Sequence, residues 1–146
     1  MFRKIVKEDY NEFLGMGEAF YKSSALEIPL EDEVIVSTFN HIVSNSPYIS
    51  GYMIEKDGVI AGFATISFAF STEFGGKLLL FEDLFIKDEF QGLGLGSKTF
   101  KFLEDTYKDE VVAIKLEVSQ VNKRARKLYL SLGYRINDYV SMIKVM

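Results

Sequence analysis

Gln91-Gly92-Leu93-Gly94-Leu95-Gly96-Ser97 is the stretch that decides how this chain is interpreted, because a glycine stands at every second position between an apolar segment and an amphipathic one. Without Cβ atoms the backbone can turn tightly, and a ligand can approach the main chain. The first turn of a following helix adds unpaired N–H groups and the positive end of the helix dipole. The stretch therefore predicts a cradle for an anion, most often phosphate. The alternative is a plain strand-to-helix turn, which needs one glycine rather than three.

The residues before the glycines predict a meander of antiparallel strands. Lys56-Asp57-Gly58 is a turn of the Asp-Gly type, which favours a hairpin between strands at 48–55 and 59–70. Gly75-Gly76 then breaks the chain before a third strand at 77–86. Earlier in the chain the pattern predicts a strand at 2–6 and helices at 8–23 and 30–43, the second of them behind Pro29 and with acidic residues 31–33 in its first turn.

The residues after the glycines alternate between helix and strand, which implies a parallel crossover. Asn122 is a good N-cap and Gly133 a good stop for a helix at 123–132, whose apolar residues fall on one stripe. The other expected elements are a helix at 95–107 and strands at 111–118, 134–136 and 139–145. No repeat or linker interrupts the pattern, so residues 1–146 are expected to form a single mixed α/β domain.

The composition of the chain argues against several classes of protein function. The chain has 146 residues and a formal charge of −4, which argues against a general nucleic-acid binder. It has no cysteine and a single histidine, His41, so no metal site is predicted. The chain start lacks a long apolar segment, and no span of about twenty apolar residues follows, so we expect neither a signal peptide nor a membrane helix. A cytoplasmic protein without membrane partners is the default expectation.

The spacing of the glycines separates three phosphate-binding patterns. The P-loop ending Gly-Lys-Ser/Thr is absent, and the last glycine falls one place early for Gly-x-Gly-x-x-Gly. Gln/Arg-x-x-Gly-x-Gly/Ala is met by Gln91, Gly94 and Gly96, and this is the acetyl-CoA signature of the GNAT superfamily of N-acetyltransferases. The segments FEDLFIKDEFQGLGLGS and LEVSQVNKRARKLYLSLGY resemble that family over roughly residues 76–135. AGFATISFAFSTEFGGKLLLFEDLF, with Glu82 and Asp83 as paired acids, is similar in layout to the spermidine/spermine acetyltransferase branch.

The resemblance implies a fold and a co-substrate. The fold is a single-domain GNAT fold: a mostly antiparallel mixed sheet of about six to seven strands, splayed near the glycine loop and flanked by about four helices. The co-substrate is acetyl-CoA, with main-chain amides on its pyrophosphate and its pantetheine arm beside a strand. The residues implied in this binding are Leu84, Phe85, Ile86, Gln91, Gly92, Leu93, Gly94, Leu95, Gly96, Ser97, Asn122 and Tyr129.

Glu82, Asp83 and Tyr129 are the candidate catalytic residues. An alkyl ammonium near pKa ~10 must lose a proton before its nitrogen attacks the thioester, and Glu82 is the preferred acceptor, with Asp83 orienting the cation. Both carboxylates reach one site only if a bulge interrupts the strand; otherwise they are merely solvated. A free N–H between Leu84 and Ile86 would stabilise the oxyanion. Tyr129 would reprotonate the leaving thiolate, although its place on an apolar stripe also fits a core tyrosine.

Several residues have weaker interpretations. Gln91 replaces the commoner arginine, and the basic run Lys123, Arg124, Arg126 and Lys127 either supplies that charge or is a solvated helix face. No role is assigned to His41. The chain also offers aromatic residues that could attract an amine and acidic residues that could favour a cationic substrate: Tyr48, Tyr52, Phe68, Phe70 and Phe74, and Glu27, Glu31, Glu33 and Glu73.

Together these features predict an N-acetyltransferase that moves an acetyl group from acetyl-CoA to a primary amine. The expected acceptor is a small cationic amine, such as a polyamine or an amino-acid derivative. Acetylation of a protein amine and a catalytically silent acyl-CoA-binding or regulatory module are the alternatives. The resemblance also allows a homodimer, paired through an exposed strand.

Overall fold

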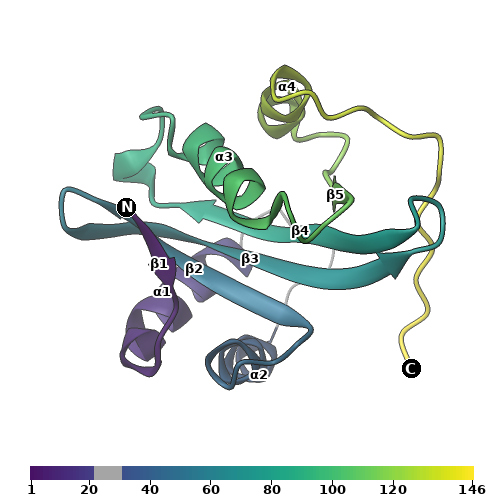
Figure 1. The fold of residues 1–146 in the computed structure, drawn as a ribbon. Coiled ribbons are helices and arrows are strands. Elements are labelled where there is room, and N and C mark those ends of the chain that lie inside the picture. Colours follow the sequence, from purple (N-terminus) through teal and green to yellow (C-terminus); the bar gives the residue numbers. More distant parts are fainter. Residues whose placement is uncertain (22–30) are drawn as a thin grey trace.

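The computed structural model describes residues 1–21 and 31–146. In these residues a sheet of five strands has the order β1-β2-β3-β4-β5, antiparallel except for the parallel pair of β4 and β5 (Figure 1). The elements along the chain are β1 (Phe2–Lys4), the 3₁₀ helix η1 (Lys7–Asp9), α1 (Tyr10–Tyr21), α2 (Asp32–Val43), β2 (Ile49–Lys56), β3 (Val59–Ser71), β4 (Gly76–Ile86), the 3₁₀ helix η2 (Asp88–Phe90), α3 (Leu95–Tyr107), β5 (Ala113–Leu116) and α4 (Lys123–Ser131).

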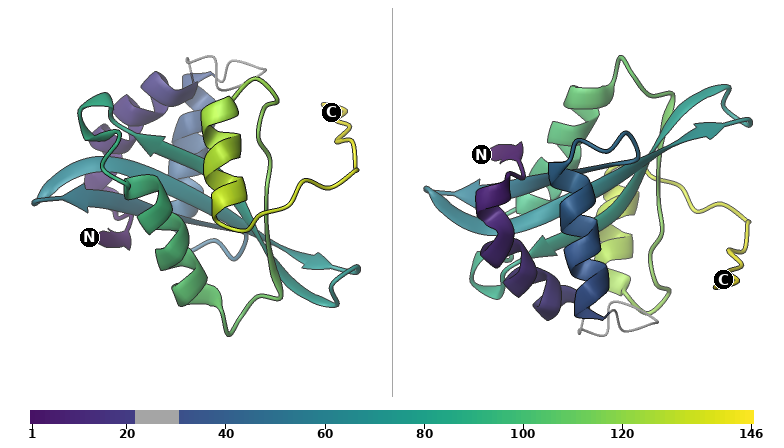
Figure 2. Two further views of the ribbon diagram at one scale, coloured as in Figure 1. Left: turned by 90° about the horizontal axis from the view of Figure 1, so that it is seen from above. Right: turned by 90° about the horizontal axis from the view of Figure 1, so that it is seen from below.

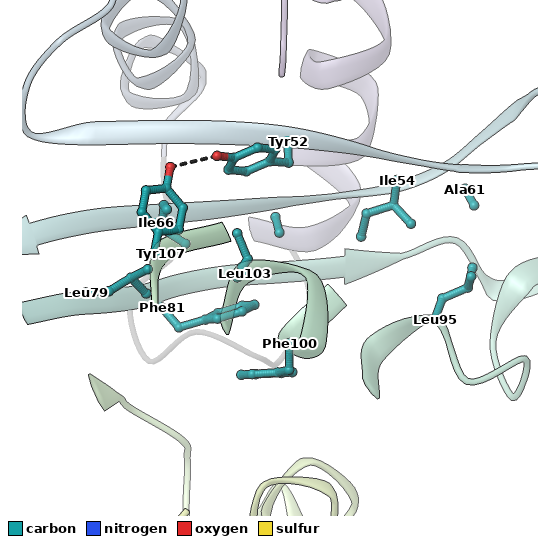
Figure 3. Close-up of a cluster of buried hydrophobic side chains, with 11 residues drawn as sticks. Tyr52, Ile54, Ala61, Ile66, Leu79, Phe81, Leu95, Phe100, Leu103 and Tyr107 are labelled. Atoms are coloured by element: carbon teal, nitrogen blue, oxygen red, sulfur yellow. Dashed lines mark hydrogen bonds between the residues drawn. The ribbon is translucent and has the colours of Figure 1, made fainter. Parts of the chain in front are cut away.

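Helices cover both faces of the sheet, and each face has its own apolar core. α1 and α2 pack on one face, where Phe13, Phe39 and Phe63 are buried, and α3 and α4 lie on the other (Figure 2). The core under α3 includes Phe81 stacked on Phe100, with ring centroids 4.2 Å apart (Figure 3). The sheet therefore forms the middle of three layers, as expected for an α/β domain.

The Asp-Gly turn forms the predicted hairpin. Asp57 has φ 52° and Gly58 has φ 79°, the pair of left-handed conformations that a tight two-residue hairpin turn requires. β2 and β3 pair across it from Lys56 and Val59 outward. The prediction of antiparallel strands on either side of this turn is confirmed.

A β-bulge in β4 sets the directions of its two acidic side chains. Thr65 of β3 pairs with Asp83, whereas the next residue, Ile66, pairs with Phe81, so Glu82 is the extra residue. Phe81 on one side of the bulge and Leu84 on the other both pack into the core under α3. Glu82 and Asp83 consequently share the opposite face, where α1 lies. A bulge is thus present at the place where a shared site for both carboxylates needs one.

The sheet splays where the acidic residues begin. The parallel ladder between β4 and β5 ends at the pair Phe81 and Leu116, while β4 continues to Ile86. Beyond this pair the two strands have no further register, and residues 82–86 of β4 keep only β3 as a hydrogen-bonded neighbour in the described sheet. The predicted splay near the glycine loop is therefore present.

The last two predicted strands are wrong. Residues 134–136 and 139–145 form no strand, so the described sheet has five strands instead of about six to seven. The side chains of Tyr139, Val140, Met142, Ile143 and Val145 are at least 75% exposed, and the segment runs away from the sheet (Figure 2). Alternating apolar residues are a local signal, whereas a strand is stable only when it finds a partner and a face to bury.

Helix ends agree closely with expectation where they can be compared. The helix predicted at 95–107 is α3, and the one predicted at 123–132 is α4 with Leu132 as its C-cap. Residues 22, 23 and 30, at the predicted ends of the two earlier helices, lie outside the described residues. Within the described chain, no helix has the length and apolar character needed to cross a membrane.

Gly62 offers a test of how tightly β3 packs on β4. A Cβ at this position would stand 2.0 Å from the carbonyl oxygen of Phe85, a backbone atom fixed by the ladder. Gly62→Ala should therefore lower the free energy of unfolding by about 3 kcal/mol. Gly15→Ala, on an open face of α1 with nothing within 4 Å, is the control and should raise it by about 0.5–1 kcal/mol. Urea denaturation measures both; equal effects would contradict the packing described.

Candidate active site

The glycine loop has the geometry of an anion cradle. Gly92 and Gly94 adopt φ 78° and 73°, and a Cβ at either would meet no atom of the described chain within 4 Å. Gly94 is the N-cap of α3 without a side-chain cap, and the first turn carries no acidic residue. The amides of Leu95, Gly96 and Ser97 thus lack helical partners. These features fit a bound pyrophosphate, whose charge the dipole end of α3 would favour.

Gly96 permits close packing of neighbouring elements and does not adopt the left-handed backbone of Gly92 and Gly94. A Cβ placed there would stand 3.3 Å from Cδ2 of Leu128 on α4 and 3.7 Å from Cδ2 of Leu84 on β4. The start of α3 is therefore in contact with both α4 and the splayed part of β4. Of the three glycines, two permit left-handed backbone and the third permits close approach of a helix.

A cleft of about 520 Å³ runs along the splayed part of β4 and reaches Gln91, the first residue of the glycine loop. Its volume lies in the range common for small-molecule sites. Sequence reasoning predicted the β4 wall and Gln91, but it missed the wall that α1 supplies, because no local signal connects α1 to β4. The lining residues are Ala19, Phe20, Leu84, Phe85, Ile86, Lys87, Asp88, Glu89 and Gln91.

Asp83 is held by two hydroxyl groups beside this cleft. The phenol of Tyr21 donates to its Oδ2 at 2.8 Å, and the hydroxyl of Thr65 donates to the same oxygen at 2.5 Å. Glu82, which is exposed, accepts a hydrogen bond from the hydroxyl of Ser67 at its Oε1. The structure thus brings both predicted carboxylates to one face of the sheet.

Burial and hydrogen bonding act in opposite directions on Asp83. Burial raises the pKa of its carboxyl above the ordinary value, while the bonds from Thr65 and Tyr21 lower it. Burial, then the charge of Asp83 and the hydrogen bond to it, raises the pKa of the Tyr21 phenol far above its ordinary value. Tyr21 therefore stays a neutral donor at every physiological pH.

Sequence reasoning did not find Tyr21, Thr65 or Ser67. Thr65 and Ser67 stand two residues apart in an otherwise apolar strand, and this period places both hydroxyls on one face. That pattern was a usable signal for a polar site. Tyr21 gave none, since it is 62 residues from Asp83 in the sequence.

Tyr129 lies on the other face of the sheet. Its ring packs edge-on against Phe100 of α3 at 5.2 Å and is tilted against Tyr134 at 6.2 Å, measured between ring centroids. Burial raises the pKa of the Tyr129 phenol, so the group carries its proton at neutral pH. Tyr129 thus packs against the core, and it is not among the residues that line the cleft, so its role as a proton donor stays a prediction.

Asn122 and Gly133 mark the ends of α4 as predicted. Oδ1 of Asn122 accepts a hydrogen bond from the amide of Ala125 at 3.0 Å, which is the N-cap contact. Gly133 follows the helix with φ 91°. A role of Asn122 toward a co-substrate stays a prediction.

Two of the aromatic candidates face the chain's own lysines. Lys4 Nζ stands 4.4 Å from the ring centroid of Tyr52, whose hydroxyl hydrogen-bonds to that of Tyr107 at 2.6 Å (Figure 3). Lys77 Nζ stands 4.1 Å from the ring centroid of Phe68. Neither ring lines the cleft described above; Phe20 and Phe85 do, with their ring centroids 5.9 Å apart.

The remaining candidates are at the surface or outside the described chain. Tyr48, Phe70 and Phe74 are at least 60% exposed. Nδ1 of His41 contacts the carbonyl oxygen of Ser37 at 2.8 Å on α2. Among the described residues no group of three or more potential metal ligands occurs. Of the acidic candidates, Glu31, Glu33 and Glu73 are exposed, and Glu27 lies outside the described residues.

Known proteins share the fold and part of the sequence. A 75-residue segment is 35% identical to thialysine N-epsilon-acetyltransferase of Bos taurus; it is 51% of this chain and 44% of that protein, so the match spans less than half of the relative. A possible acetyltransferase from Clostridium difficile 630 has a TM-score of 0.86 at 15% identity, over 100% of this chain and 97% of that one. AAC(6')-Iy, solved with the bisubstrate analog CoA-S-monomethyl-acetylneamine, has a TM-score of 0.80 at 16% identity, over 100% and 97%.

The family follows from a sequence match that covers most of the chain. Residues 5–134, which include α1, the splayed strand, the glycine loop and α4, match the profile described as Acetyltransferase (GNAT) family. This range covers most of the chain, and the sequence resemblance that began at the glycine loop is thereby confirmed. The chain belongs to the acetyltransferase (GNAT) family.

Proposed function

We propose that this chain is an N-acetyltransferase that moves the acetyl group of acetyl-CoA to a small cationic primary amine. One observation carries the proposal: a cleft runs along the open part of β4 to Gln91, the first residue of the glycine loop, and Glu82 and Asp83 directly precede the residues of β4 that line it. The proposed anion site and the proposed cation site would thus be connected by a stretch of β4 that has a hydrogen-bonded neighbour on one side only in the described sheet.

The co-substrate would be held mainly by backbone groups. The amides of residues 92–97 would bind the pyrophosphate, since that of Gln91 already donates to the carbonyl oxygen of Asp88 at 3.1 Å. The open edge of Leu84, Phe85 and Ile86 would pair with the amide-bearing arm, as one strand pairs with another. Such pairing needs no charged side chains. A free N–H on the same edge would stabilise the oxyanion that forms when the amine attacks.

The carboxylates would handle the amine and its proton. The amine arrives as an ammonium ion with pKa near ~10, so it must lose a proton before its nitrogen can attack the thioester carbonyl. Exposed Glu82 is the proposed proton acceptor, directly or through water. Asp83, anchored by Tyr21 and Thr65, would attract and orient the cation.

Tyr129 would complete the transfer. When the carbon–sulfur bond breaks, a thiolate leaves, and a neutral phenol can give it a proton. Burial raises the pKa of the Tyr129 phenol, so the phenol is protonated at neutral pH when the thiolate forms. The phenolate that results can then recover a proton from solvent.

The relatives support an amine acceptor without naming it. One is described as acting at the ε-amine of thialysine, and another was solved with an analog that joins CoA to an acetylated aminoglycoside fragment. Both descriptions concern amines and an acetyl group. The acidic pair beside the cleft favours a cationic member of this class, with polyamines and amino-acid derivatives as the leading candidates.

The proposal is tested with acetyl-CoA and a panel of amines. Polyamines, lysine analogues, aminoglycosides, neutral amines and a peptide with a free amine are each mixed with the protein, and free thiol release is followed with a chromogenic reagent. We expect release with the small cationic amines. Binding of acetyl-CoA without turnover of any amine would instead identify a silent acyl-CoA-binding module. Turnover of the peptide alone would make a protein amine the acceptor.

Tyr129→Phe should lower kcat at least about tenfold and leave the affinity for acetyl-CoA nearly unchanged, because only the transferable proton is removed. The matched control is Tyr134→Phe. The ring of Tyr134 packs beside that of Tyr129, and the buried hydroxyl of Tyr134 has no hydrogen-bond partner among the described residues. That variant should retain kcat. An unaltered rate in Tyr129→Phe would leave this residue with a packing role only.

Separate effects are expected from the two carboxylates. Glu82→Gln should lower kcat by about 10²-fold, because a general base is lost. Asp83→Asn should mainly raise KM for a cationic amine, because an attracting charge is lost. Asp109→Asn, at an exposed position after α3, removes the same charge elsewhere and should change neither constant.

The hydrogen bond from Tyr21 adds a check that depends on pH. This bond lowers the pKa of Asp83, so Tyr21→Phe should raise that pKa. As the pH decreases, Asp83 becomes protonated and kcat/KM falls. In Tyr21→Phe this fall should therefore begin at a higher pH than in the unaltered protein. Tyr10→Phe, at the other end of the same helix, should keep the native profile. A profile unmoved by Tyr21→Phe would count against a role for ionised Asp83.

A further inference from the structure

Gln91 stands where the Gln/Arg-x-x-Gly-x-Gly/Ala pattern more commonly has an arginine, so position 91 gives the glycine cradle no positive charge. The structure places another cation against the same side chain: Nη1 of Arg124 on α4 donates to Oε1 of Gln91 at 3.0 Å. The two residues are 33 positions apart in the sequence. The contact therefore depends on how α4 packs on the loop.

Gln91 is oriented to receive this contact. Its Nε2 donates to Oδ1 of Asp88 at 2.9 Å and to the carbonyl oxygen of Ile86 at 3.2 Å. These bonds use the amide nitrogen and direct the amide oxygen, the only acceptor of the side chain, toward Arg124. The glutamine thus bridges the loop and α4.

The position of Arg124 is fixed by two further contacts of α4. Leu128 lies one helical turn further along, on the same face of the helix, and it packs on Gly96 at the start of α3. Asn122 caps the helix just before Arg124. The packing of Leu128 on Gly96 therefore holds the Arg124 guanidinium beside the glycine loop.

We propose that Arg124 supplies the phosphate-binding charge of the glycine cradle, in place of an arginine at position 91. This inference rests on the proposed use of acetyl-CoA. A guanidinium has five N–H donors, and only one is used on Gln91, so a pair remains for the oxygens of a pyrophosphate. Arg124 is exposed, so a ligand can reach it. Gln91 acts as its positioning residue.

Arg124→Gln tests the proposal through direct binding of acetyl-CoA by calorimetry. We expect Kd to rise about five- to thirtyfold at low salt, and the difference from the unaltered protein to shrink as salt screens the charge. The matched control is Arg126→Gln, on another face of α4, where Nη1 contacts the carbonyl oxygen of Gln120 at 3.5 Å. Kd should change little in the control, and the melting temperature of both variants should stay near that of the unaltered chain.

A second substitution tests whether the charge itself matters. In the Arg124→Gln background, Gln91→Arg should restore most of the lost affinity, because it returns a cation to the loop; a purely structural role of Arg124 would not be rescued this way. Acetyl-dephospho-CoA, which lacks the 3′-phosphate, should show the same loss in Arg124→Gln. If that loss disappears, Arg124 serves the 3′-phosphate, and the assignment to the pyrophosphate is overturned.

The outcomes separate this inference from the proposed function. An unaltered protein that does not bind acetyl-CoA contradicts the proposed function. An unaltered protein that binds it, together with an Arg124→Gln variant that binds equally well, contradicts the inference alone.

Discussion

The candidate site depends on the single extra residue in β4. Without the bulge at Glu82, alternation would send Glu82 and Asp83 to opposite faces, and one of them would enter the apolar core under α3. With it, both acids leave that core, while Phe81 and Leu84 stay in it. The ladder to β5 ends just before the bulge, so the same interruption of the strand coincides with the open edge of β4.

Packing of α4 is the second condition for the site. Gly96 has no side chain, so Leu128 can reach the first turn of α3, and the contact brings Arg124 to the glycine loop. A glycine that a sequence motif assigns to ligand binding thus has a separate task between two helices. Gly92 and Gly94 keep the conformational task, since both have positive φ. One short motif therefore controls the shape of the cradle and the approach of its nearest cation.

Sequence patterns succeeded where the signal was local. The Asp57-Gly58 turn, the caps of α4 and the start of α3 each rest on a few neighbouring residues, and each was found. The position of the bulge followed from the hypothesis that two adjacent acids line one site, and the sequence alone left solvated carboxylates as the alternative. The strands expected after Gly133 failed because a strand needs an edge to pair with, which no alternation of residues supplies. The wall of the cleft on α1 and the donor to Asp83 were missed because such contacts join distant segments.

The hydrogen bond between Tyr21 and Asp83 connects α1 to the strand that carries both proposed catalytic carboxylates. In the proposed reaction the glycine loop and the edge of β4 would hold acetyl-CoA, whereas the groups around the carboxylates would contact the amine. Those groups come from α1, through Ala19, Phe20 and Tyr21, and from the hydroxyls of β3. A change in α1 would therefore alter which amine fits and how strongly Asp83 holds its charge, while leaving the cradle intact. In the proposed reaction, different segments of the chain would thus bind the acetyl donor and the amine, and these segments meet at the bulge of β4.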